Sequence, residues 1–499
     1  MKYLIFASLI FLLACSSNPD QKSYMSSKYA EKYRPQFHFT PPEKWMNDPN
    51  GMFFYEGEYH LFYQYYPDSN VWGPMHWGHA VSEDMVKWEH LPVALYPDSL
   101  GYIFSGSAVV DWGNTSGFGS EGNPPLVAIY TYHNMEGEKS GRTDYQYQGI
   151  AYSIDKGRTW QKYEQNPVLP NQGIKDFRDP KVFWFDAGEK WVMTLAEWDH
   201  VSFYSSKDLK SWVKESDFGL EYGNHAGVWE CPDLFEMQIE GTDQHKWVLL
   251  VSINPGGPQG GSATQYFVGD FDGQQFTLDD DFIPEVSKVN EAEQAVWLDY
   301  GADNYAGVTW SDIPKEDGRR LFIGWMSNWD YAQVVPTYKW RSAMTIPREL
   351  KLYFANRRYR VHSKPVDELN AYVIDDSSGQ QDSTFLITAG VAGDFEIAIS
   401  NSSNEEISIK LEEGKLKFDR SRSGNTDYSE GFGSIHEVDM EAIMPSKIEV
   451  FVDVSSIEVF INDGEIVMTE LVFPNVPYTQ VSSEGSISNL NTLPIKSIW

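Results

Sequence analysis

The sequence predicts an all-β protein, a five-bladed β-propeller followed by a β-sandwich. Three observations support this fold class. Aromatic residues make up 15% of the 499 residues, and aromatic side chains suit the pleated surface of a sheet. A unit of strand, acidic turn and aromatic residue recurs through the first two thirds of the chain. Short strands in which apolar and polar residues alternate fill the last third.

The N-terminus has the form of a bacterial lipoprotein signal. One lysine is followed by an apolar run from Tyr3 to Ala14 and then by Cys15. The run is too short to span a bilayer and is typical of a signal peptide. The letters "LLAC" resemble a lipobox, in which Cys15 becomes the lipidated first residue. The alternative is an ordinary signal peptide with a cysteine nearby. We expect residues 1–14 to be the signal peptide, residues 15–33 a polar tether, and the protein to lie in the bacterial cell envelope.

The repeated unit predicts the propeller. An acid is followed by an aromatic residue four or five positions later, and the units lie about 50 to 70 residues apart. Four-stranded blades arranged around an axis produce such spacing; four unrelated hairpins are the alternative. We expect five blades within residues 34–348. The pairs of acid and aromatic residue are Asp84 and Trp88, Asp155 and Trp160, Asp208 and Trp212, and Asp272 and Phe276.

The C-terminal third predicts a second β domain. Tryptophan becomes rare after Trp340, with only Trp499 remaining. The segment 447–467 alternates with a period of two and contains an Asn-Asp-Gly turn, which is typical of antiparallel hairpins. Regular short strands over residues 349–499 indicate a β-sandwich. A short helix is expected in the connection at 366–374.

The composition excludes several function classes. The formal net charge of −33 argues against nucleic-acid binding and against electrostatic docking on anionic lipid, so membrane attachment is expected only through the lipid. Cys231 is the only other cysteine, so with Cys15 acylated no intrachain disulfide or cysteine-based metal site can form. Histidines are sparse and scattered. We expect no metal and no organic cofactor, and a monomer.

Three acids share one sequence context, at the start of a strand-like aromatic run. Asp48 lies in "KWMNDPNG", Asp179 in "DFRDPKVFWF" and Glu230 in "GVWECPDLFEM". A residue before proline favours extended backbone, which applies to Asp48 and Asp179. The innermost strands of a propeller line its axis, so these acids would converge in one funnel. The alternative is a set of ordinary turn residues and separately solvated acids.

A group of this kind suits the cleavage of glycosidic bonds. One carboxylate attacks the anomeric carbon and a second carboxylic acid protonates the leaving oxygen. A third anion holds substrate hydroxyls and stabilises positive charge on the ring. Like charges at short range raise the pKa of one member, which supplies an acid at neutral pH.

The three motifs "WMNDPNG", "FRDPKV" and "ECPD", in this order, resemble those of glycoside hydrolase family 32, the invertases, inulinases and levanases. Flanking segments agree, among them "HLFYQYYP", "FSGSAV" and "LDYGADNYAGVTW". The resemblance runs from about residue 34 to the C-terminus. It implies a five-bladed propeller, a β-sandwich and a retaining hydrolase of β-fructans or sucrose.

The resemblance also implies residue roles. Asp48 matches the nucleophile, Glu230 the general acid/base and Asp179 the stabiliser of the transition state. The positions that match fructose-binding residues of the family are Asn47, Gln64, Trp72, Ser105 and Arg178. Phe104, in the flanking segment "FSGSAV", is a further candidate for substrate binding. Trp325 and Trp329 are candidates for a wall beyond the terminal fructose, or for packing residues.

The segment 324–350 looks more like fructan-degrading members than like sucrose-dedicated invertases. The favoured interpretation is a tethered hydrolase that releases fructose from levan or inulin and from sucrose. An invertase or a fructosyltransferase of the same family is an alternative, and a fructan-binding lipoprotein without activity is an alternative of another class. Linkage preference, exo or endo attack and the side of the envelope stay open.

Overall fold

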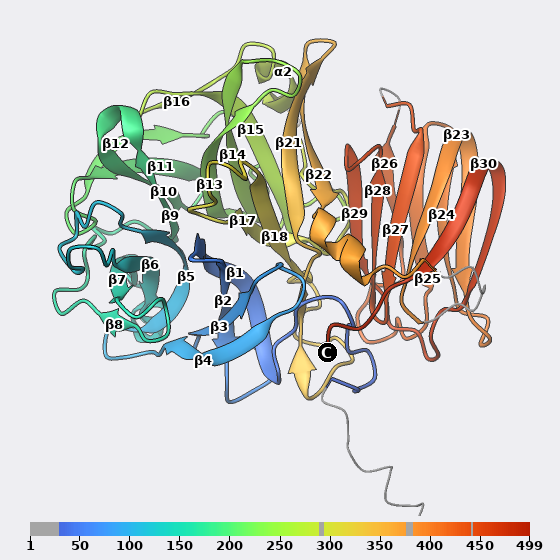
Figure 1. The fold of residues 1–499 in the computed structure, drawn as a ribbon, viewed down its shortest axis with the longest axis horizontal. Coiled ribbons are helices and arrows are strands. Elements are labelled where there is room, and N and C mark those ends of the chain that lie inside the picture. The colour runs from blue at the N-terminus through green and yellow to red at the C-terminus, as the bar shows by residue number, and fades with distance from the viewer. Residues whose placement is uncertain (1–28, 289–293, 376–382, 441–442) are drawn as a thin grey trace, which may run out of the picture.

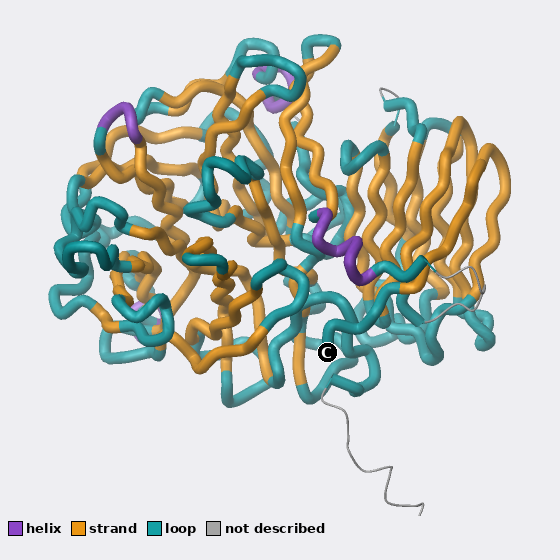
Figure 2. The backbone as a smooth tube through the Cα atoms, viewed as in Figure 1, coloured by secondary structure: helices purple, strands orange, loops and turns teal. Residues whose placement is uncertain are grey.

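The structure is a computed structural model that describes residues 29–288, 294–375, 383–440 and 443–499. Cys15, the predicted signal peptide and most of the predicted tether lie outside the described residues. Among the described residues, no helix has the length and hydrophobicity that a membrane span needs. Strands are the main regular structure of the described chain, and the few helices are short (Figure 2). They are α1 (Met135–Lys139), α2 (Ile283–Val286), η2 (Asp186–Gly188) and η3 (Asp367–Tyr372).

Five antiparallel sheets form the propeller, on the left in Figure 1. The first blade contains β1 (Lys44–Tyr55), β2 (Glu58–Tyr66), β3 (His76–Ser82) and β4 (Glu89–Leu95), with β19 (Trp340–Arg341) parallel to β1. The second contains β5 (Tyr102–Val110), β6 (Leu126–His133), β7 (Gln146–Ser153) and β8 (Gln161–Lys162). The third contains β9 (Phe177–Phe185), β10 (Lys190–Glu197), β11 (His200–Ser206) and β12 (Val213–Phe218).

The last two blades complete the ring. The fourth contains β13 (Val228–Gln238), β14 (His245–Asn254), β15 (Ala263–Phe271) and β16 (Phe276–Leu278). The fifth contains β17 (Tyr305–Thr309), β18 (Arg320–Met326), β20 (Ala343–Met344), β21 (Arg348–Ala355) and β22 (Arg358–Pro365). The first strand of each blade contacts the first strands of both neighbouring blades, so β1, β5, β9, β13 and β17 line the axis.

The repeated sequence unit is the turn between the third and fourth strands of a blade. In the first blade, Oδ1 of Asp84 accepts hydrogen bonds from the backbone N–H groups of Val86 and Lys87, at 2.9 and 2.8 Å. Nε1 of Trp88 then donates to the carbonyl of Met85 at 2.8 Å. The units at Asp155 and Asp208 form the same kind of turn. An aspartate that caps the turn and an indole that closes it explain why both residues recur in the first three blades. The fourth blade keeps the capping aspartate, Asp272, and has Phe276 in place of the indole.

The fifth blade extends further than the sequence indicated. We expected the propeller to end at residue 348, but β21 pairs with β18 and β22 pairs with β21, so the fifth sheet ends at Pro365. The hairpin turn of β21 and β22 is formed by Asn356 and Arg357, both with positive φ, and lacks the acid–aromatic unit. The expected connecting helix is present as η3, a 3₁₀ helix.

The C-terminal domain is a β-sandwich, on the right in Figure 1. Its strands are β23 (Phe385–Ser400), β24 (Glu406–Glu412), β25 (Lys415–Arg422), β26 (Ile435–Asp439), β27 (Lys447–Asp453), β28 (Ser456–Ile461), β29 (Ile466–Leu471) and β30 (Gln480–Pro494). The first half of β23 pairs with β27 and its second half with β24, while β30 follows β23 along both halves. The two long strands therefore bend from one layer to the other around an aliphatic core.

Buried ion pairs join the two domains. Arg348 of the fifth blade donates to Asp299 at 2.9 Å and to Glu458 of the sandwich at 2.6 Å. His38, ahead of β1, lies between Asp453 at 2.7 Å and Glu458 at 2.9 Å. All five side chains are buried. Removal of one partner would leave an uncompensated buried charge, so this interface fixes the orientation of the domains.

Candidate active site

The three predicted acids lie at the beginning of three axial strands, Asp48 in β1, Asp179 in β9 and Glu230 in β13. Each lies at or beside a shift of pairing register: between Asn47 and Pro49 in the first blade, between Arg178 and Lys181 in the third, and between Glu230 and Asp233 in the fourth. Such a bulge turns one side chain away from the regular alternation of the strand. The axial strands therefore aim these carboxyl groups into the funnel.

At these bulges, two residues that are not glycine have a left-handed backbone, which the sequence did not predict. Asp179 has φ 66° and Cys231 has φ 47°. The extended conformation expected for Asp179 ahead of proline is therefore wrong, because the bulge imposes its own geometry. Gly51 has φ 51°, and a Cβ there would lie 2.6 Å from the ring of Trp77. Only glycine fits beside Asp48 in this motif without displacement of the indole.

Hydrogen bonds hold both carboxylate oxygens of Asp48. Oγ of Ser105 donates to Oδ2 at 2.8 Å, and Nδ2 of Asn47 donates to Oδ1 at 3.0 Å. Nε1 of Trp45 donates to Oδ1 of Asn47 at 2.7 Å, which fixes the orientation of that amide. Burial raises the pKa of Asp48 to about 6, with a contribution from the negative charge of Glu230, against the lowering effect of the two donors. The result is an oriented carboxylate that titrates close to neutral pH.

Asp179 is held through both its backbone N–H and its carboxylate. Its own N–H donates to Oγ1 of Thr131 at 3.0 Å, and its Oδ2 accepts from the N–H of Cys231 at 3.0 Å. Burial raises the pKa of Asp179 to about 7; the cation of Arg178 lowers it, and the charges of Glu230 and Asp48 raise it further. The N–H of Cys231, next to Glu230, binds Asp179, and Arg178, next to Asp179, binds Glu230, so these two acids lie side by side in the funnel.

Glu230 has a cation on one oxygen and a phenol on the other. Nε and Nη2 of Arg178 donate to Oε1 at 3.0 and 2.9 Å. The hydroxyl of Tyr305, from β17, donates to Oε2. Nη1 of Arg178 is bound by Oδ1 of Asp176 at 2.6 Å, which fixes the guanidinium plane. Burial and the charge of Glu230 raise the pKa of Tyr305 well above its usual value, so this phenol stays a donor.

The residues predicted to bind substrate lie around these acids. Gln64 is paired in register with Asn47, and within the described part of the chain its buried Nε2 has no hydrogen-bond partner. Ser105 and Arg178 contact the acids directly, as described above. Trp72 and Phe104 are half-buried and meet edge to face, with ring centroids 6.1 Å apart. Phe104 belongs to β5, the strand that carries Ser105, and Trp72 packs against it.

Trp325 and Trp329 differ from each other. The side chain of Trp325 is fully buried and packs against Trp45, Tyr305 and Trp329, with centroids 6.2, 6.3 and 5.0 Å apart. It has no exposed face for a sugar, so its candidate role as a subsite wall is wrong and packing is its function. Trp329 is partly buried and stacks on Trp45 at 5.9 Å, so its role as a subsite wall stays a prediction.

Sequence reasoning missed three functional neighbours: Trp45, Asp176 and Tyr305. Tyr305 lies inside "LDYGADNYAGVTW", which carried a resemblance but no assigned role. Asp299 and Asp303 of the same segment bind Arg348 and Arg420 at the domain interface, at 2.9 and 2.8 Å. One short segment therefore ties the sandwich to Glu230. The signal available in the sequence was the position of Tyr305 at the start of a strand, as for the three acids.

One group of histidine and acids, Glu197, His200 and Asp217, has metal-ligand spacing among the described residues. Nζ of Lys214 binds Glu197 at 3.1 Å and Asp217 at 2.8 Å. A lysine ammonium therefore already neutralises these carboxylates. The group lies in the third blade and none of its members is one of the three axial acids.

Comparisons with known proteins agree with the fold and the motifs. The models of the N-terminal and C-terminal domains of glycosyl hydrolases family 32 match residues 38–365 and 351–497. A levanase of Bacillus subtilis is 46% identical over 530 aligned positions, covering 100% of this chain and 75% of that protein. The extracellular exo-inulinase of Aspergillus niger is 40% identical, covering 90% of each chain. The crystal structure of the exo-inulinase from Aspergillus awamori has a TM-score of 0.85 at 35% identity, covering 94% of this chain and 100% of that one. The chain belongs to glycosyl hydrolases family 32.

Proposed function

We propose that the protein is a retaining β-fructosidase that releases fructose from levan or inulin and from sucrose. The observation that carries this proposal is the paired environment of Asp48 and Glu230: one carboxylate is oriented through both oxygens, and the other is held by a cation and a phenol. Similar proteins named levanase and exo-inulinase support the substrate class.

In the first step, an oxygen of Asp48 attacks the anomeric carbon of the terminal fructose. The bond from that carbon to the leaving oxygen breaks, and the proton of Glu230 passes to this oxygen. A covalent fructosyl ester of Asp48 and a shortened glycan result. Arg178 binds Oε1 of Glu230, so Oε2 is the oxygen that carries the proton, next to the phenol of Tyr305.

In the second step, water attacks the anomeric carbon and the ester bond to Asp48 breaks. Glu230, now ionised, accepts the proton of the water and returns to its acid form. Asp179 acts in both steps through the ring hydroxyls, and its negative charge stabilises the positive charge that develops on the ring. Asn47, Gln64, Ser105 and Arg178 orient the fructose or the acids.

Chromatography of early products tests this function. Incubation with levan, inulin and sucrose separates the possibilities: free fructose alone indicates exo attack, oligosaccharides indicate endo attack, and longer products at high sucrose indicate transfer. The expected product is free fructose from all three, with the Asp48→Ala chain as the blank. Binding of polymer without any product would refute the enzymatic proposal in favour of a fructan-binding lipoprotein.

We also propose that Cys15 anchors a monomeric enzyme to the cell envelope through a lipid. The support is the sequence alone, a short apolar run that ends in "LLAC" ahead of a Ser-rich tether. Cys15→Ala should move the enzyme from the membrane fraction to the soluble fraction at unchanged specific activity, and the released chain should elute as a monomer. An unmodified N-terminus on wild-type protein in the soluble fraction would refute the anchor.

A further inference from the structure

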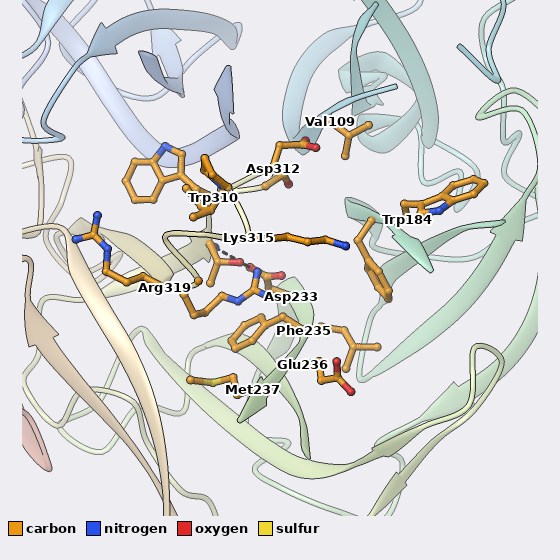
Figure 3. Close-up of a pocket in the computed structure, with 18 of the residues that line it drawn as sticks. Val109, Trp184, Asp233, Phe235, Glu236, Met237, Trp310, Asp312, Lys315 and Arg319 are labelled. Carbon is orange, nitrogen blue, oxygen red and sulfur yellow. Dashed lines mark hydrogen bonds between the residues drawn. The ribbon is translucent and has the colours of Figure 1, made fainter. Parts of the chain in front are cut away.

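A cavity of about 1160 Å³ (Figure 3) lies where the axial strands end, whereas the acids lie where these strands begin. The five axial strands each begin near the acids, and the cavity is lined by the later residues of four of them. These include Val109 at the end of β5, Trp184 near the end of β9 and Phe235 in β13. The residues that line the cavity do not include the three acids, Asp48, Asp179 and Glu230. The cavity is therefore a second mouth of the same axis.

A buried polar layer separates the two mouths. Nζ of Lys181 lies 3.3 Å from Oδ2 of Asp233 and donates to the carbonyl of Thr309. The same Oδ2 accepts from the N–H and Oγ1 of Thr309 at 2.6 and 2.8 Å. Lys181 and Asp233 belong to the motifs "FRDPKV" and "ECPD", so these motifs close the axis as well as carry the acids. A ligand in the second mouth would not contact the catalytic groups.

Two tryptophans at this mouth present their rings to solvent. Trp112 is 65% exposed and Trp184 is 38% exposed. Nε1 of Trp112 donates to Oδ1 of Asp312 at 2.9 Å, and the ring of Trp184 meets Trp191 edge to face at 5.1 Å, so both indoles are held in position. Rigid, amphipathic indole faces at the rim of a cavity are suited to stacking against sugar rings.

The polar lining suits a neutral, hydroxyl-rich ligand. Among the described residues, neither Oδ1 of Asp233 nor Nε of Arg320, both buried in the lining, has a hydrogen-bond partner. Lys315 extends across the cavity (Figure 3) and lies 4.0 Å from Asp186, with its side chain 96% exposed. The lining holds seven acids and five bases, and this negative excess, together with the net charge of −33, disfavours a polyanion.

We propose that this mouth is a second carbohydrate-binding site that holds an inner segment of a fructan chain. It would keep the enzyme on the polymer while the catalytic mouth acts on chain ends, and a local tether raises the effective concentration of those ends. The identity of the ligand rests on the proposed fructan substrate; the site itself rests on the two indoles and the unpartnered polar atoms.

Affinity electrophoresis of the full chain through gels that contain levan or inulin tests the proposal. All chains carry Asp48→Ala, so the polymer is not degraded. Trp184→Ala and Lys315→Ala should each weaken the affinity for polymer at least fivefold relative to the parent. Phe354→Ala is the matched control, because Phe354 is an aromatic residue with a similar exposure of 40% outside the lining; it should bind as the parent does.

Kinetics with chains that retain Asp48 complete the test. Trp184→Ala and Lys315→Ala should raise KM for the polymer. With sucrose as substrate, both kcat and KM of these variants should stay within twofold of the wild-type values. Equal polymer affinity in all variants, or an equal loss in the Phe354→Ala control, would overturn the second site. Failure of the chain with Asp48 to release fructose from polymer would instead refute the proposed function, and the gels would still decide on the site.

Discussion

The phenol of Tyr305 donates to Oε2 of Glu230, the oxygen that Arg178 leaves free. The two residues come from neighbouring blades, Tyr305 from β17 and Glu230 from β13, and meet at the axis. Tyr305 lies two residues after Asp303, which binds Arg420 of the sandwich at 2.8 Å. The position of the proposed acid/base therefore depends on a segment that the C-terminal domain also holds.

Tyr305→Phe tests this relationship. Loss of the hydroxyl leaves Oε2 of Glu230 without its donor, so kcat for sucrose should fall about tenfold, a barrier change of ~1.4 kcal/mol, with KM within twofold. Tyr204→Phe is the control, since Tyr204 also donates to a carboxylate, Oε1 of Glu197 at 2.6 Å, within the third blade. Equal losses in the two variants would mean that Tyr305 is only structural.

The proposed roles of the acids predict different rescue behaviour. Asp48→Ala removes the attacking group, so turnover should fall to background for every substrate. Glu230→Ala keeps the nucleophile, so its activity should partly return with an activated aryl fructoside, whose leaving group needs no proton, and with added azide, which attacks without a general base. Turnover rates of both variants, measured on fructosides with different leaving groups, test these roles. Turnover of Asp48→Ala within about tenfold of wild type would refute the mechanism.

The environment of Asp48 predicts an acidic limb in the pH dependence of kcat/KM. The nucleophile must be ionised and its pKa is raised to about 6, so activity should rise as the pH increases through about 6. Ser105→Ala removes a hydrogen bond that favours the charged form, which raises this pKa and should move the limb to higher pH by roughly half to one unit. The midpoint belongs to Asp48 and Asp179 together, because the two titrations interact.

Ser205→Ala is the control for that measurement, since Oγ of Ser205 donates to Glu215 at 2.5 Å outside the funnel. Its profile should coincide with that of the wild type. A limb that moves to lower pH in Ser105→Ala would contradict the assignment of Asp48.

The domain interface predicts a loss of stability at alkaline pH. Burial disfavours the His38 cation, but its bonds to Asp453 and Glu458 outweigh this and raise its pKa to about 9. A raised folded-state pKa gives stability that is fully present below the unfolded value of about 6.5 and is lost as the pH rises through about 9. The contribution is on the order of 3 kcal/mol.

Denaturant unfolding between pH 6 and 10 measures the contribution of His38 to the free energy of unfolding. Wild type should lose stability across this range, and His38→Asn should be less stable at pH 6 with a flatter profile. The exposed His245→Asn serves as the control and should follow the wild type. A wild-type profile that does not fall between pH 6.5 and 9.5 would refute a charged His38 in the folded protein.

The sequence alone determined the fold class, the propeller and the positions of the three acids. Local rules account for this. An Asp-capped turn followed by an indole recurs in the first three blades, where it joins the third and fourth strands, and alternation over 447–467 became β27, β28 and the start of β29. The motifs around Asp48, Asp179 and Glu230 are short enough to be read from the chain.

The tertiary structure decided what depends on contacts between distant residues. The end of the fifth blade at Pro365 follows from strand pairing with β18. The left-handed backbone of Asp179 follows from a bulge, whereas the local Asp-Pro preference is extended. Trp325 is a packing residue because Trp45, Tyr305 and Trp329 surround it. Burial and the charges of other blades set the pKa of each acid, and no window of the sequence contains those neighbours.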